Sequence, residues 1–179
     1  HGVFRRQRQM CIRDSPKRAR VSGSKPFDGE GLCASERKIV SDGVLKEWTL
    51  DLSTAAKLGL KSTGSAVRAP SAPPAPGVGN VELTQGVHTR EDLIRDMGTG
   101  LLLTSLIGSS INENTGDYSR GASGFWIENG EITYPVNEFT IAGNLREMLI
   151  NLIPANDGRV HLSRVIPSLL ISEMSIAGQ

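Results

Sequence analysis

The stretch GDYSRGASGFWIENGEITYP, residues 116–135, decides how the rest of the chain is interpreted. Asn129 and Gly130 both tolerate positive φ, as a type I′ turn requires, and the residues that flank them are rich in strand formers. We therefore predict a glycine-rich turn that leads into a β-hairpin closed at Asn129-Gly130. Pro135 is expected to end the second strand, because proline has no N–H to donate to a ladder.

The two strands of this hairpin should present different faces, because side chains alternate along a strand. The predicted apolar face carries Phe125, Ile127, Ile132 and Tyr134, and the opposite face carries Trp126, Glu128, Glu131 and Thr133. The sequence thus distinguishes an apolar face from a mixed one.

Polar side chains precede the hairpin, between glycines that allow close backbone approach or positive φ. A carboxylate, a phenol, a hydroxyl and a guanidinium follow one another in Asp117, Tyr118, Ser119 and Arg120. This composition predicts a substrate-binding or interface site. The alternative is purely structural, with Asp117 and Ser119 capping the turn and Arg120 pairing with a nearby acid.

The region before residue 62 contains a second turn signal and a helix signal. Asp42-Gly43 predicts another hairpin, between strands at 33–41 and 44–50. Ser53 is expected to cap a short helix that ends at Gly59.

The segment 62–80 differs in kind from its surroundings, because prolines and glycines leave almost no prospect of helix or strand. Its breakers are Pro70, Pro73, Pro74, Pro76, Gly77 and Gly79. We interpret it as a long surface loop, either functional or a disordered insertion.

Downstream elements complete the expected fold. They are a strand at 81–83, a helix from Thr89 to Met97, an apolar strand at 100–108, a strand at 139–142, a helix from Asn144 to Leu152 and an alternating tail at 168–176. The continuous apolar run at 100–108 implies burial on both faces of that strand. With about seven strands and three short helices, we predict an α+β domain of mainly antiparallel β-sheet, rolled or barrel-like.

Charge is unevenly distributed along the 179 residues, a length that fits a single domain. Residues 1–25 carry eight Lys/Arg and one acid, whereas the remainder carries twelve Lys/Arg and eighteen acids. A basic arm can bind nucleic acid. However, the chain starts at His1 and RRQRQMCIRDS is typical of a translated adapter sequence, so we interpret residues 1–24 as a non-native or disordered arm and expect no nucleic-acid partner.

The cysteine content and the hydropathy pattern favour a cytoplasmic protein. Cys11 and Cys33 make neither a disulfide framework nor a metal cluster. No apolar run approaches the roughly 18 residues of a membrane span, and no signal-peptide pattern is present. We expect no membrane partner.

Catalytic groups are hard to place in this chain. The histidines His1, His88 and His161 are far apart, and none belongs to an HExxH or HExxxH motif that would hold a protease zinc. A triad of Ser119 and Asp117 with a histidine lacks the strand–turn–helix context of a nucleophile. We therefore predict no catalytic residue and no metal ligand.

Several runs together carry a resemblance to a known family. They are DGVLKEWTLDLSTAAKLGLKSTG, MGTGLLLTSLIG, GDYSRGASGFWIENGEITYPV, FTIAGNL and PSLLISEMSIAGQ. From about Pro26 to Gln179 the chain resembles the C-terminal region of the TldD/PmbA family. That family comprises bacterial zinc-metalloprotease subunits, with a catalytic TldD chain and a companion PmbA chain, also called TldE.

The resemblance implies a function for the chain. In the catalytic TldD type a cysteine near the C-terminus completes the zinc site, whereas the corresponding span here, 153–167, has no cysteine. The resemblance therefore points to the PmbA (TldE) type, a companion without a cofactor of its own, partnered by a TldD-type subunit in which zinc is expected.

The same resemblance gives the polar residues a role. Asp117, Tyr118, Ser119 and Arg120 would lie at or near the cleft that holds an extended or unfolded peptide substrate for hydrolysis at the partner's zinc. The alternative function is that of a non-enzymatic binding or scaffold module that uses the polar turn between Gly116 and Gly124.

Overall fold

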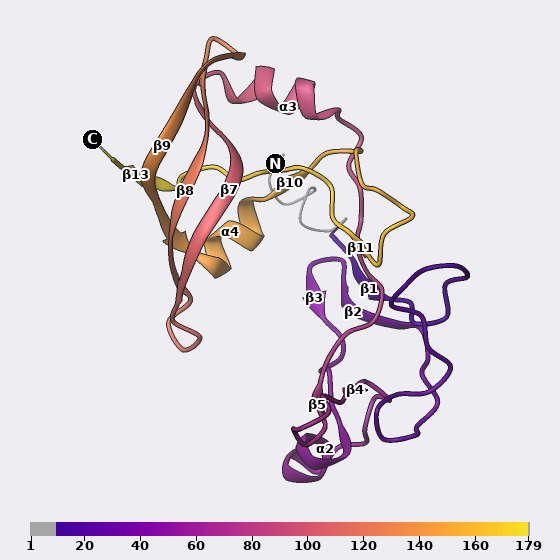
Figure 1. Ribbon diagram of the computed structural model, residues 1–179. Helices are drawn as coiled ribbons and strands as arrows, with labels where there is room; N and C mark the ends of the chain where they lie inside the picture. The colour runs from indigo at the N-terminus through magenta and orange to yellow at the C-terminus, as the bar shows by residue number, and fades with distance from the viewer. Residues whose placement is uncertain (1–9, 179) are drawn as a thin grey trace. The chain divides into compact units, whose positions relative to one another are not determined.

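The computed structural model describes residues 10–178, which form two compact units (Figure 1). The first unit contains the residues up to Gln85 together with Gly158–Pro167. The second, here called the sheet unit, contains Gly86–Asp157 and the residues from Ser168 onward. The chain therefore returns to the first unit after building most of the second.

A five-stranded sheet organises the first unit. Its order is β11 (Arg164–Val165), β6 (Val81–Leu83), β1 (Ile12–Asp14), β2 (Arg37–Ser41) and β3 (Val44–Leu45). Neighbouring strands are antiparallel except for β11 and β6, which are parallel. Asp42 and Gly43 have φ values of 54° and 74°, so the predicted second hairpin is confirmed, although its strands are shorter than expected.

The predicted arm, residues 1–24, belongs to the first unit from residue 10 onward. β1 pairs with β2 on one side and with β6 on the other, so it lies at the centre of the sheet. Asp14 is buried and accepts hydrogen bonds from the backbone N–H groups of Gly79 and Asn80. The prediction that residues 10–24 lie outside the fold was wrong, because the partners of Asp14 are distant in sequence; residues 1–9 lie outside the described part of the chain.

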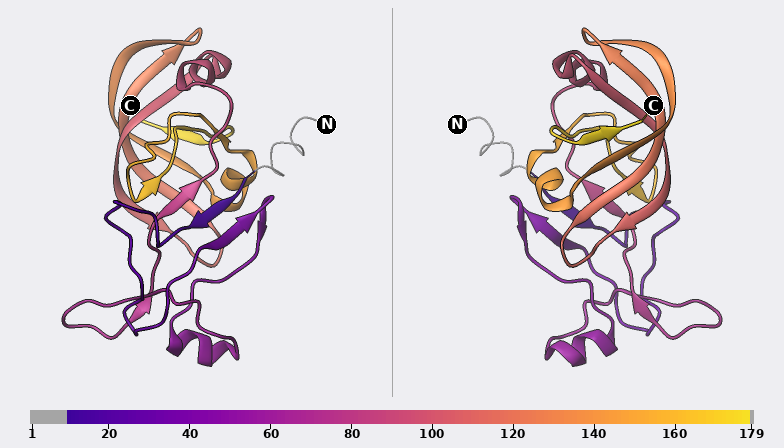
Figure 2. Two further views of the ribbon diagram at one scale, coloured as in Figure 1. Left: turned by 90° about the vertical axis from the view of Figure 1, so that its right-hand side faces the viewer. Right: turned by 90° about the vertical axis from the view of Figure 1, so that its left-hand side faces the viewer.

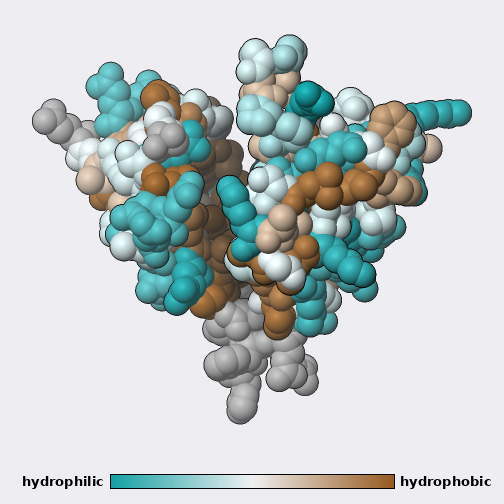
Figure 3. Space-filling model, turned by 90° about the horizontal axis from the view of Figure 1, so that it is seen from below, coloured by the Kyte–Doolittle hydropathy of each residue, from teal (hydrophilic) through white to brown (hydrophobic). Residues whose placement is uncertain are grey.

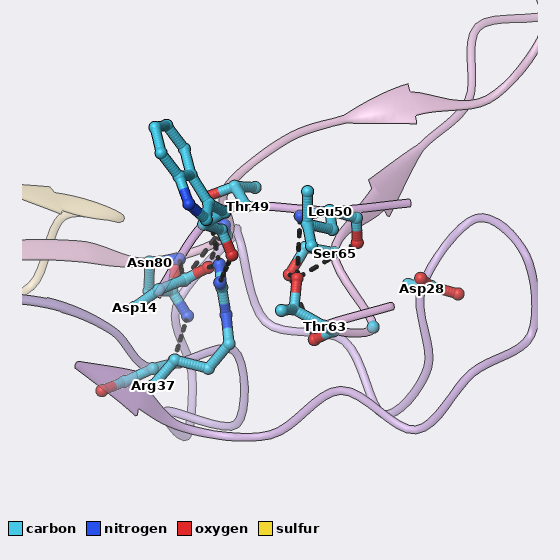
Figure 4. Close-up of polar contacts among 12 residues, drawn as sticks. Asp14, Asp28, Arg37, Thr49, Leu50, Thr63, Ser65 and Asn80 are labelled. Carbon is cyan, nitrogen blue, oxygen red and sulfur yellow. Dashed lines mark hydrogen bonds and ion pairs between the residues drawn. The ribbon is translucent and has the colours of Figure 1, made fainter. Parts of the chain in front are cut away.

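A buried ion pair joins this central strand to its neighbour. Arg37 Nη2 lies 3.2 Å from Asp14 Oδ2, and both side chains are 4% exposed. Arg37 Nη1 donates to the Trp48 carbonyl oxygen at 3.2 Å, so the guanidinium also fixes the chain that follows β3 (Figure 4). Buried charges require such partners, and the arrangement supplies them.

Helix α2 (Leu52–Leu58) begins two residues earlier than predicted. Asp51, not Ser53, is its N-cap, and Asp51 and Thr54 form a reciprocal capping box. Gly59 ends the helix in the left-handed conformation, with φ 66°, as expected.

The proline-rich segment contains more structure than its composition indicated. β4 (Ala66–Val67) pairs with β5 (Ala75–Pro76), so the prediction of a loop without strands was wrong at these positions. The buried Asp28 carboxylate accepts from the backbone N–H groups of Ala66, Leu32 and Glu30. This carboxylate holds the start of the segment in place.

A four-stranded antiparallel sheet dominates the sheet unit, and its long strands β7, β8 and β9 lie side by side (Figure 1). Its order is β13 (Ser175–Ala177), β9 (Glu131–Asn144), β8 (Asp117–Glu128) and β7 (Gly100–Ile111). Asn129 and Gly130 have φ values of 53° and 77°, and Glu128 pairs with Glu131, which confirms the predicted hairpin.

The faces of this hairpin do not follow strict alternation. Ile127 is fully buried, whereas Phe125, Ile132 and Tyr134 are exposed. The pairing register shifts between Phe125 and Ile127, and such a bulge interrupts the alternation on which the prediction was based.

Pro135 does not end β9, which continues to Asn144. It pairs with Phe125 of β8, whereas β13 pairs with β9 only at residues 140–142. At Pro135, therefore, no strand pairs with β9 on the side where β13 lies further along. Such an edge position tolerates a residue that lacks an N–H.

Two helices and a short strand pair complete the sheet unit. α3 (Arg90–Met97) has Thr89 as its N-cap, and α4 (Leu145–Asn151) has Asn144, as predicted. The Gly130 N–H donates to the Gly98 carbonyl at 2.7 Å, so the hairpin turn lies against the end of α3 (Figures 1 and 2). β10 (Ile153–Pro154) pairs with β12 (Leu169–Leu170).

The fold is α+β with mainly antiparallel sheets and three helices in the described chain, which confirms the predicted class. The sheets are open rather than closed into a barrel. None of the helices in residues 10–178 is long and apolar enough to cross a membrane.

Candidate functional site

The four predicted site residues occupy the beginning of β8 instead of a turn. Asp117 pairs with Asn144 and Tyr118 with Gly143 of β9, while Ser119 pairs with Ser110 of β7. The turn itself is shorter and precedes them, and it ends at Gly116 with φ 82°. The polar side chains are therefore positioned by a sheet.

Asp117 ties this turn to the start of α4. Its Oδ2 accepts from the Thr115 hydroxyl at 2.7 Å. Asn144 Nδ2 lies 3.5 Å from Asp117 Oδ1 and also donates to the Thr115 carbonyl at 3.0 Å. Asp117 thus links the turn to the N-cap of α4.

Arg120 has a different partner from the acid that was expected. Its Nε donates to the Gly108 carbonyl oxygen at 2.6 Å. Gly108 has φ 70° and lies where the pairing of β7 with β8 shifts between Ile107 and Ser110. Arg120 therefore supports a bulge in β7, and the ion pairs of the described chain do not include it.

An open groove brings three of the four residues together. Asp117, Tyr118 and Ser119 line it together with Ser110, Ile111, Asn112, Glu113, Ala142 and Gly143. Arg120 does not belong to this lining, and neither does a histidine. The groove presents two carboxylates, hydroxyls and strand backbone, which suits binding by hydrogen bonds rather than nucleophilic catalysis.

The neighbouring strand β7 is the feature that the sequence prediction missed. Burial on both faces was expected, but Leu103, Leu106, Ile107 and Ile111 are exposed, with Ile107 at 68%. Within the described chain β7 pairs only with β8, and residues 100–112 contain no charged side chain. Apolar groups are visible on the surface of the sheet unit (Figure 3).

Such an edge is unusual because proteins commonly protect exposed edge strands with charges, prolines or bulges. β7 has bulges between Leu103 and Ser105 and between Ile107 and Ser110, but it has neither of the other two devices. A long apolar edge without charges is available to pair with another extended chain.

The described residues do not fit a zinc site of their own. No group of three His, Cys, Asp or Glu in residues 10–178 could hold a metal ion. His88 is half-buried beside the N-cap of α3, and its carbonyl accepts from Asn156 N–H. His161 is exposed in a turn.

The segment in which the catalytic type would carry a cysteine has another local anchor. Asp157 accepts from both the backbone N–H and the hydroxyl of Ser168, each at 2.7 Å. Burial alone would raise the pKa of Asp157, but the two hydrogen bonds from Ser168, a further backbone hydrogen bond and the charge of Arg90 together lower it. The ionised carboxylate of Asp157 thus joins this segment to Ser168.

Comparison with known proteins assigns the chain to a family. Residues 7–178 match the model of the PmbA/TldA metallopeptidase C-terminal domain. The chain is 43% identical over 171 residues to metalloprotease PmbA of Escherichia coli O157:H7 and 44% identical over 174 residues to a PmbA homologue of Haemophilus influenzae. These matches cover 95% and 94% of this chain and 36% of each relative.

A solved structure agrees with this result. TldE from Thermococcus kodakarensis has a TM-score of 0.81 and 25% identity, over 96% of this chain and 40% of that one. The chain belongs to the PmbA/TldD family and corresponds to its C-terminal domain. It spans little more than a third of the length of the curated relatives that it matches.

Proposed function

We propose that this chain is the C-terminal domain of a PmbA (TldE) type subunit that assists a TldD-type metalloprotease in the cytoplasm. The observation that carries the proposal is the 43% identity to metalloprotease PmbA across 95% of the chain. The absence of a cysteine from 153–167 supports the companion type over the catalytic type. Zinc would belong to the TldD-type partner and would supply the water that attacks the peptide bond.

This chain's contribution would be to hold the substrate in an extended conformation. The uncharged β7 edge offers backbone donors and acceptors, and the groove at the start of β8 adds Asp117, Tyr118 and Ser119. Pairing along a strand edge gives affinity through the main chain and requires little sequence choice. An unfolded peptide is the substrate class that such a surface suits.

The proposal is tested by purifying the intact protein with its native partners. Zinc is measured in each component, and hydrolysis of an unfolded peptide is measured for each component and for the mixture. We expect zinc in a TldD-type partner and activity only when both chains are present. Zinc or activity in this protein alone would show that the wrong member of the pair had been assigned.

A third outcome identifies the alternative function. A stable complex with a partner of another kind, without zinc in either component and without hydrolysis in the mixture, would favour the binding or scaffold module over the companion subunit.

A further inference from the structure

A second cavity lies in the sheet unit, away from the β8 groove. Its volume is about 530 Å³, and it lies between the start of β7 and the C-terminal segment. The apolar side chains that line it include Met97, Leu101, Leu103, Ile141, Met174 and Ile176. A cavity of this size and composition can accept large apolar side chains.

The charged residues that line this cavity all have the same sign. Asp96 and Glu173 are acidic and exposed, and no lysine, arginine or histidine belongs to the lining. Neither acid takes part in an ion pair with another described residue. A ligand that places a cation beside an apolar group therefore matches the cavity in charge.

The backbone at the cavity indicates what kind of ligand this is. β12 ends at Leu170 and β13 begins at Ser175, and the four residues between them line the cavity. Within the described chain, their N–H and C=O groups make no hydrogen bond. Glu173 has φ 63°, a conformation that is uncommon for residues with a side chain.

Residues 171–174 are exposed or partly exposed, so their backbone groups are accessible to a ligand, and an extended peptide supplies donors and acceptors along its length. We propose that this cavity binds an extended polypeptide segment in which apolar side chains alternate with lysine or arginine. The apolar groups enter the cavity, the long cationic side chains on the opposite face bend back toward the exposed Asp96 and Glu173, and the main chain pairs with residues 171–174. This goes beyond the proposed companion role and does not rest on it, because binding is measured with this chain alone.

The test uses three fluorescein-labelled hexapeptides and fluorescence anisotropy with the full chain. The first alternates leucine and lysine, the second leucine and glutamate, and the third leucine and glutamine. We expect the leucine–lysine peptide to bind about tenfold more tightly than the leucine–glutamate peptide at low salt, and the difference to shrink as salt rises. Equal affinity for these two peptides would overturn the proposal.

Two variants locate the binding. Asp96→Asn combined with Glu173→Gln should weaken the leucine–lysine complex about fivefold and leave the leucine–glutamine complex unchanged. Ser172→Trp places an indole at the cavity and should weaken all complexes, whereas Ser71→Trp, in an exposed loop of the first unit, should weaken none. Unchanged binding in the isosteric double variant would refute the charge match even if Ser172→Trp failed to fold.

Discussion

The two units of the molecule differ in the interactions that stabilise them. The buried polar or charged side chains of the described residues all lie in the first unit: Asp14, Asp28, Arg37, Asp51, Ser65 and Asn80. The hydrophobic cluster of the sheet unit consists of Ala122, Phe139 and Ile141, and large apolar side chains are exposed in both units. The first unit buries polar groups that have specific partners, with the exception of Asn80 Oδ1, and the sheet unit relies on strand ladders.

This difference determines which substitutions each unit should tolerate. A buried polar group that loses its partner leaves a desolvated donor or acceptor, so the first unit depends on individual side chains. In the sheet unit the long strands pair along main-chain ladders, so positions of close backbone approach matter most. Each of the following predictions tests one side of this contrast.

The largest expected effect is that of Arg37→Ala in the first unit. The substitution leaves Asp14 buried without its cation and removes the donor to the Trp48 carbonyl. We expect the free energy of unfolding, measured with urea, to fall by about 3–5 kcal/mol. Arg95→Ala is the matched control, because its pair with Asp92 is exposed and should contribute less than about 1 kcal/mol. A loss of similar size in both variants would contradict the contrast between the units.

Gly124→Ala should have the next largest effect, in the sheet unit. A Cβ at this position would lie 2.0 Å from the Leu102 carbonyl oxygen and 3.1 Å from Leu103 Cα, so the β7–β8 pair would have to separate. We expect a loss of about 3 kcal/mol in thermal or urea unfolding.

Gly121→Ala is the control on the same strand. Its Cβ would meet its nearest neighbour, the Ile107 carbonyl oxygen, at 3.6 Å, an ordinary contact. The loss should therefore stay below about 1 kcal/mol. If Gly121→Ala proved as destabilising as Gly124→Ala, close strand approach would not be the cause.

The same contrast explains what could be predicted from the sequence. Asn129-Gly130, Asp42-Gly43, Thr89 and Asn144 act on residues next to them, so their turns and caps were predictable. The role of Asp14 depends on Arg37, 23 residues away, and on Gly79, 65 residues away. No local pattern reveals such a pairing, so a basic composition dominated the interpretation of that segment.

The candidate site was predictable only in part for a related reason. Asp117, Tyr118 and Ser119 do share a groove, as their proximity in sequence indicated. The partner of Arg120 is a carbonyl at a bulge in β7, and a bulge depends on the pairing of two strands. The exposure of β7 was missed because an apolar run looks the same in sequence whether the strand is buried or lies at an exposed edge.

Acidification should reveal a smaller contribution of the first unit. Burial alone would raise the pKa of Asp28, but backbone hydrogen bonds from Ala66, Leu32 and Glu30, with the charge of Lys25, lower it below 3.8. A lowered folded-state pKa contributes stability above the unfolded-state pKa and loses it as the pH falls through the folded-state value.

The measurement is urea unfolding between about pH 7 and pH 2.5, a range that brackets the reference pKa of aspartate, about 3.9. Asp28→Asn should lower the free energy of unfolding by about 2 kcal/mol at pH 7, and its difference from the original chain should shrink as pH falls below about 4. A difference that stays constant down to the acid limit would show that the charge of Asp28 does not contribute.

Arg120→Ala should have the smallest effect on stability and a larger one on function. The loss of the hydrogen bond to Gly108 should cost about 1 kcal/mol in urea unfolding, because the guanidinium is only half-buried. By contrast, hydrolysis of an unfolded peptide by the complex with the TldD-type partner should be impaired, since the bulge that Arg120 supports lies on the β7 edge proposed to hold the peptide. Arg120→Lys should impair hydrolysis less than Arg120→Ala, because lysine can still donate to the Gly108 carbonyl. Unchanged turnover in Arg120→Ala would remove Arg120 from the proposed site and leave it as a support for the β7 bulge alone.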